Sequence, residues 1–282
     1  MKKKSSFVVQ ILIGFILISS SILLARTESY AGPSSGTGQP AAAQKATEPQ
    51  GDPRSLELNE QGVQAVKAKN FTKAEELFKR SIAVDPQNLT AVFNLASMYL
   101  TNKSEESAIS LLETYTEKVQ NDAGLFARLG DAYFATKKPD EALTAYEKAL
   151  ALDKGYPGLL ERLGTVYALR NRFGDAERML ILASDQNPRD PQLLANLSSI
   201  YLKNKKPQES ITAARRALQV KPTTEVYVTM GSAYETLGDF SNALISFQRA
   251  KDLGDKRAEL EKKIAALTAN QPKRSSASTS AS

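Results

Sequence analysis

The chain has 282 residues, a formal net charge of +6 at pH 7, and no His, Cys or Trp. These absences exclude disulfides, Cys/His metal clusters, thiol nucleophiles and imidazole bases, and no P-loop or dinucleotide-binding glycine pattern is present. Paired carboxylates remain possible, but Asp and Glu lie mostly at predicted helix starts and on solvated faces, so we expect a non-enzymatic protein without cofactor or metal.

Residues 1–31 have the features of an export or membrane segment. Lys2 to Lys4 precede an apolar run of 18 residues from Phe7 to Leu24. Cations ahead of such a run hold the amino terminus in the cytoplasm, so the following chain is translocated. Residues 29–31 offer a small-x-small cleavage site, yet the run also reaches the lower length limit of a spanning helix. A cleaved signal peptide and a transmembrane anchor both remain open, and we expect an extracytoplasmic location, in the periplasm or cell envelope.

The next segment, residues 32–54, contains Gly, Pro, Ser, Ala and Gln with no large apolar side chain. Such a composition buries too little surface to offset the entropy of ordering the chain. We predict a disordered linker that spaces the following domain from the membrane.

A repeated pattern occupies residues 55–257. Within residues 123–156, two sets of apolar and small residues at helical spacing flank a short break, which predicts two antiparallel helices, called helix A and helix B below. The small position of helix A returns in steps of 34, 34, 34, 34 and 33, at Gly62, Ala96, Gly130, Gly164, Ser198 and Gly231. The chain therefore divides into six units, 55–88, 89–122, 123–156, 157–190, 191–223 and 224–257.

Further columns follow the same interval. A tyrosine occurs in helix A of five units, and small residues recur in helix B, as at Ala142 and Ala149. The pattern resembles the tetratricopeptide repeat family, although the first unit departs from it with Ala65 in place of tyrosine. The resemblance implies an all-α solenoid, a right-handed superhelix of antiparallel helix pairs. Small residues permit close helix crossing, so we expect Gly130 to face Ala142 and Ala149.

Two segments follow the sixth unit. Residues 258–270 place Leu260, Ile264 and Leu267 on one helical stripe, which predicts a helix that caps the last open face. Residues 271–282 are predicted to be a disordered Ser-rich tail.

The charge distribution argues against a nucleic-acid partner. Residues 1–54 contribute +3 and the tail contributes +2, which leaves about +1 for residues 55–270. Cations cluster where helix A ends and carboxylates where helix B begins. This arrangement complements the helix dipoles, and an anion-binding ridge is the alternative interpretation.

The family resemblance implies a concave groove, lined by the side of each helix A opposite the core, that binds peptides or partner elements. Its candidate residues are Val63, Phe93, Asn94, Ser97, Leu100, Arg128, Asp131, Phe134, Arg162 and Asn196. The apolar members predict a binding strip flanked by Asn94 and Arg128, unless they pack on the neighbouring helix A. Only these two flanking residues match the five-residue carboxylate clamp of some family members, so we do not expect that clamp.

These observations predict an exported or membrane-anchored scaffold that binds a protein or peptide partner, in assembly of an envelope complex. One alternative is a structural subunit that forms homo-oligomers or other assemblies through the solenoid ends or convex face. A remote alternative is a cryptic enzyme built on carboxylates.

Overall fold

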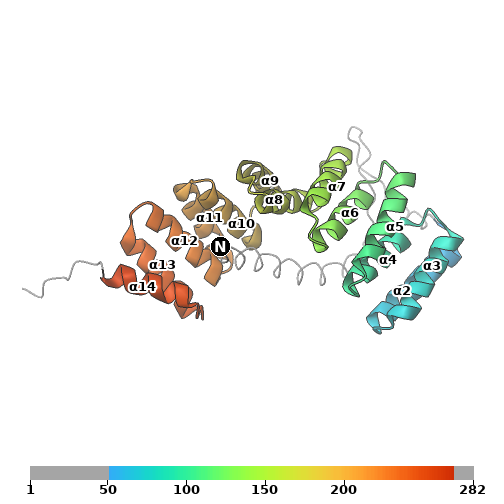
Figure 1. Cartoon of the computed structure of the whole chain (residues 1–282), viewed down its shortest axis with the longest axis horizontal. Helices are drawn as coiled ribbons and strands as arrows, with labels where there is room; N and C mark the ends of the chain where they lie inside the picture. The colour runs from blue at the N-terminus through green and yellow to red at the C-terminus, as the bar shows by residue number, and fades with distance from the viewer. Residues whose placement is uncertain (1–50, 270–282) are drawn as a thin grey trace, which may run out of the picture. The chain divides into compact units, whose positions relative to one another are not determined.

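The computed structural model describes residues 51–269, which form thirteen α-helices, α2 to α14, and contain no strand (Figure 1). The helices divide between Tyr156 and Pro157 into two compact units, α2–α7 in unit 1 and α8–α14 in unit 2. The predicted all-α class, built from consecutive antiparallel helix pairs, is confirmed.

Unit 1 contains three helix pairs, and a three-residue turn joins the members of each pair. Short turns of this kind hold consecutive helices antiparallel. The helices are α2 (Pro53–Lys67), α3 (Phe71–Val84), α4 (Leu89–Thr101), α5 (Glu105–Lys118), α6 (Ala123–Ala135) and α7 (Pro139–Leu152).

Unit 2 contains three more pairs with the same turns, followed by a single helix. The pairs are α8 (Leu159–Leu169) with α9 (Phe173–Gln186), α10 (Pro191–Lys203) with α11 (Pro207–Val220), and α12 (Thr224–Thr236) with α13 (Phe240–Asp252). The single helix is α14 (Ala258–Ala269), whose Leu260 and Leu267 are buried against α13 with Ile264 partly buried beside them. The predicted capping helix is therefore confirmed.

The first described helix begins earlier than the sequence predicts. The Asp52 side chain accepts a hydrogen bond from the Arg54 N–H, and Pro53 suits the first helical position, where no N–H is needed. Residues 53 and 54 are thus helical, and not part of the linker.

The remaining terminal predictions lie outside the described residues. They are the signal peptide or anchor of residues 1–31, the linker as far as residue 50, and the tail from residue 271. Within residues 51–269, no helix combines the length and the apolar character needed to cross a bilayer.

Helices A and B of a pair interlock at the small position of helix A, which is Gly130 in the third repeat. A Cβ atom on Gly130 would lie 2.5 Å from two carbons of the Tyr146 ring, which is buried. The sequence places Gly130 opposite Ala142 and Ala149 but does not indicate that the Tyr146 ring makes the nearest contact. The same contact, sixteen residues apart, recurs between Gly62 and Phe78 in unit 1 and, in unit 2, between Gly164 and Leu180 and between Gly231 and Phe247.

The turns between helices A and B share a left-handed residue. Its φ lies between 58° and 61° at Lys69, Lys103, Lys137, Asn171 and Lys205, and is 75° at Gly238. The following N–H reaches back five residues, as from Lys138 to the Tyr133 carbonyl at 2.9 Å, which is the Schellman pattern of helix ends. The cations noted in the sequence are therefore turn residues as well as partners of the helix dipole.

Candidate partner-binding surface

The ten predicted groove residues all lie on A helices, and each is partly exposed. Eight belong to α2, α4 and α6 of unit 1, whereas Arg162 of α8 and Asn196 of α10 belong to unit 2. We call the surface formed by these eight residues the helix A face of unit 1. It is considered separately from the two residues of unit 2.

Arg128 and Phe93 form the centre of the helix A face. The guanidinium carbon of Arg128 lies 4.7 Å from the centroid of the Phe93 ring, a cation–π geometry. One guanidinium nitrogen, Nη1, donates a hydrogen bond to the Ser97 hydroxyl at 3.3 Å, while the buried Nε has no hydrogen-bond partner. No carboxylate among residues 51–269 forms an ion pair with Arg128, so the face presents an oriented cation whose charge is not neutralised.

A glycine keeps space open beside this cation. A Cβ on Gly124 would lie 3.3 Å from the tip of the Phe93 ring, which is a tight contact. A side chain at position 124 would therefore crowd the Phe93 ring that lies beside Arg128. Sequence reasoning placed both Phe93 and Arg128 on this face but did not find their contact.

The other polar residues of the face are partly engaged. Asn94 donates a hydrogen bond to the Asn59 side chain at 2.9 Å, which links α4 to α2. Asp131 accepts a hydrogen bond from the Tyr146 hydroxyl at 2.8 Å, so its carboxylate fixes the ring that fills the space at Gly130. The structure therefore gives Asp131 a packing role that the sequence did not indicate.

The apolar residues of the face divide into two groups. Val63, Phe93 and Leu100 are partly buried and pack against the core of unit 1, while retaining exposed surface. Phe134 is also partly exposed, near the end of α6. The strip can therefore contribute apolar contact area without any change in the core.

In unit 2, the corresponding side of α8 and α10 is more polar. The Gln192 amide donates to the Asn196 side-chain oxygen at 3.1 Å. Next to Arg162, Glu161 is partly buried, and this burial, followed by the negative charge of Asp190, raises the pKa of its carboxyl. The sequence does not indicate this burial, because it depends on the surrounding helices.

Comparisons with known proteins agree with this architecture. One tetratricopeptide repeat model matches residues 65–130 and 133–200, and a second matches residues 191–224 and 224–253. Among curated proteins, protein O-mannosyl-transferase TMTC1 of Homo sapiens is 26% identical over 60% of this chain and 20% of its own length. Anaphase-promoting complex subunit CDC16 of Saccharomyces cerevisiae is 25% identical over 68% of this chain and 24% of its own length. The chain thus spans only a quarter or less of these two relatives.

Solved structures show the same fold at low identity. PilF of Pseudomonas aeruginosa superposes with a TM-score of 0.62 at 15% identity, over 77% of this chain and 98% of that one. YrrB, a TPR protein, superposes with a TM-score of 0.62 at 19% identity, over 69% of this chain and 99% of the YrrB chain. The repeat spacing, the paired helices and the matched segments together show that the chain belongs to the tetratricopeptide repeat family, whose members generally mediate protein–protein interactions and are generally non-catalytic.

Proposed function

We propose that this protein is a non-enzymatic scaffold that binds a segment of a protein partner on the helix A face of unit 1. The observation that carries the proposal is the Arg128 guanidinium, held over Phe93 without a carboxylate partner. An arginine in this state offers its remaining N–H groups to an acidic side chain, a terminal carboxylate or backbone carbonyls. Phe93 and the neighbouring apolar residues then supply contact area.

Two neighbours in fold support a protein or peptide as the partner. YrrB is a TPR protein with an unusual peptide-binding site, and PilW is a type IV pilus biogenesis factor. Each shares less than 20% identity with this chain, so the support is for the kind of partner only.

The partner is identified by crosslinking in cells followed by mass spectrometry, and its segment is then titrated against variants. Arg128→Ala should weaken binding at least about tenfold, because desolvated Arg anchors commonly dominate binding energy. Its helical circular dichroism should be unchanged, since Arg128 lies outside the core. Arg80→Ala, an exposed arginine on α3, is the matched control and should keep full affinity. Full affinity of Arg128→Ala, with loss in the helix B variant Lys148→Glu, would favour the structural-subunit alternative.

We further propose that the repeats act outside the cytoplasm, in an envelope assembly. Lys2 to Lys4 and the apolar run from Phe7 to Leu24 support this location. A reporter enzyme that is active only after export, fused at Gln271, should be active, and deletion of residues 1–25 should abolish its activity. An inactive full-length fusion would reject the location but leave the binding proposal intact.

A further inference from the structure

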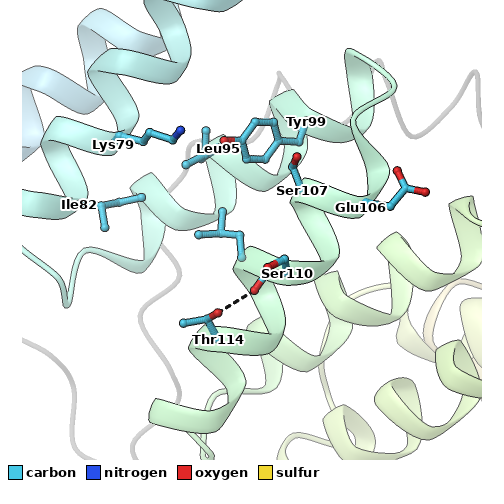
Figure 2. Close-up of a pocket in the computed structure, with 9 residues that line it drawn as sticks. Lys79, Ile82, Leu95, Tyr99, Glu106, Ser107, Ser110 and Thr114 are labelled. Carbon is cyan, nitrogen blue, oxygen red and sulfur yellow. Dashed lines mark hydrogen bonds between the residues drawn. The ribbon is translucent and has the colours of Figure 1, made fainter.

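A hollow opens on the helix B side of unit 1, between α3, α4 and α5 (Figure 2). Its volume is about 510 Å³, within the range of ligand pockets in proteins. One wall comes from Lys79 and Ile82 of α3 and the other from α5, while Leu95 and Tyr99 of α4 form the floor. None of these residues belongs to the helix A face.

The wall from α5 is built of short hydroxyl side chains. Ser107, Ser110 and Thr114 fall on one stripe of the helix, and all three are exposed. The hollow is therefore open to solvent along α5, with an apolar floor completed by Leu111. An open hollow of this kind fits the side chains of a helix laid between two helices better than an enclosed small molecule.

The next repeat shows why the space is empty here. At the positions of Ser107, Ser110 and Thr114, helix α7 carries Glu141, Thr144 and Lys148. The Lys148 ammonium lies 5.6 Å from the centroid of the Phe126 ring, so α7 carries a long side chain packed along its own repeat where α5 carries the short Thr114. Short side chains on α5 therefore leave the hollow open.

The charges around the hollow favour a cationic occupant. Lys79 is already paired with Glu75 at 2.7 Å, and Glu75 also accepts a hydrogen bond from the Tyr99 hydroxyl. Helix α5 carries four Glu and one Lys. Of these, Glu106 and Glu117 are eleven residues apart, which places them on nearly the same stripe at the two ends of the hydroxyl row. In the part of the chain that the structure describes, neither Glu106 nor Glu117 forms an ion pair, so the excess charge beside the hollow is negative.

We propose that this hollow docks a basic amphipathic helix of a protein partner. A large apolar side chain of that helix enters the hollow over Leu95 and Leu111. Lys or Arg residues on either side of it, about three turns apart, meet Glu106 and Glu117. The proposal adds a second docking surface, so that one chain holds two partners at once, and it does not depend on the helix A face.

The test uses a synthetic, fluorescently labelled helical peptide with one Leu/Phe stripe and Lys residues three turns apart, together with a version in which Glu replaces each Lys. Binding to the whole chain is followed by fluorescence anisotropy. The basic peptide should bind and the acidic peptide should bind at least about tenfold more weakly. Ser110→Trp fills the hollow and should weaken binding of the basic peptide at least about tenfold. Thr144→Trp, at the equivalent exposed position of α7, is the matched control and should bind like wild type.

The same assay tests the role of Glu106 and the independence of the hollow from the helix A face. Glu106→Lys should weaken binding about fivefold or more, whereas Glu141→Lys on α7 should have little effect. Arg128→Ala should bind the basic peptide like wild type, which separates this surface from the helix A face. Absence of binding, equal binding of both peptides, or wild-type affinity in Ser110→Trp would overturn the proposal. A dimer of the chain that Ser110→Trp dissociates in sedimentation equilibrium would overturn it in favour of a second copy as occupant.

Discussion

The contact between Gly130 and Tyr146 makes Gly130→Ala a sensitive test of the interlocked helix pair. The added Cβ would lie 2.5 Å from two ring carbons. The ring has little freedom to move, because it is 2% exposed and its hydroxyl is bonded to Asp131 at 2.8 Å. Overpacking of this kind costs about 1–3 kcal/mol, and a pinned ring places the cost in the upper part of that range.

The same change also removes a glycine from a helix, which returns up to about 1 kcal/mol. We therefore expect a net loss of about 1–2 kcal/mol. For a domain of this size the melting temperature, followed by circular dichroism, should fall by about 2–8 °C. Gly174→Ala is the matched control, because Gly174 is also helical but a Cβ added there would meet no atom within 4 Å. It should be neutral or slightly stabilising.

A double variant tests the mechanism. In the second repeat, Ala96 and Leu112 occupy the two equivalent positions, and both are buried. Gly130→Ala combined with Tyr146→Leu recreates that pair, so its loss of stability should be smaller than the sum of the two single losses. Equal melting temperatures for Gly130→Ala and Gly174→Ala, or simple additivity in the double variant, would refute the interlocking contact.

Three further predictions concern turns, pH and the cap. Lys103 and Gly238 both adopt the left-handed conformation, which glycine tolerates better than other residues. In thermal denaturation, Lys103→Gly should therefore stabilise the fold and Gly238→Ala should destabilise it, by about 0.5–1 kcal/mol each. Shifts of the melting temperature in the same direction for both variants would contradict this. Burial raises the pKa of Glu161, so the folded state loses stability as pH rises from the unfolded pKa through the folded one. Glu161→Gln should therefore gain stability over wild type as pH rises from about 4 in urea titrations. Glu75→Gln should show the opposite pH dependence, because hydrogen bonds from Lys79 and Tyr99 lower the pKa of Glu75. The stability advantage of wild type over Glu75→Gln is therefore present above the unfolded pKa and is lost as pH falls through the folded pKa. Parallel curves of stability against pH for the two variants would contradict both predicted directions. Leu260→Ala should cost about 2–4 kcal/mol and speed amide hydrogen exchange in α13 and α14, and unchanged exchange would argue against the capping role.

The sequence was sufficient for the fold because the periodic columns record a local rule repeated six times. The spacing of Gly130 and its equivalents predicted the helix pairs, and the stripe through Leu260 predicted the cap. The identity of the residue opposite Gly130 was missed, since the pattern shows which positions are small but not which side chain fills the space. Left-handed Lys103 was missed because lysine itself gives no signal of that conformation.

The candidate surfaces were predicted less completely. Helical geometry placed Arg128 and Phe93 on one side, but their stacking depends on the distance between α4 and α6. The role of Asp131 depends on the Tyr146 hydroxyl reaching across from α7. The hollow beside Ser110 arises from side chains that are short on one helix and apolar on another, so no single segment of sequence indicates it.

The sixteen-residue contact also limits how the repeats can be exchanged in evolution or design. Where helix A carries a glycine, the helix B residue opposite it is large, as Tyr146 is opposite Gly130. Where helix A carries a larger residue, the helix B residue is smaller, as Ala214 is at the position facing Ser198. Joining the helix A that carries Ala96 to the helix B that carries Tyr146 would force a clash, whereas the reverse exchange would create a glycine–leucine pair like the one at Gly164 and Leu180. Recombination should therefore be tolerated between repeats and rejected at the turn inside one, and the two positions of each contact should change together among related sequences.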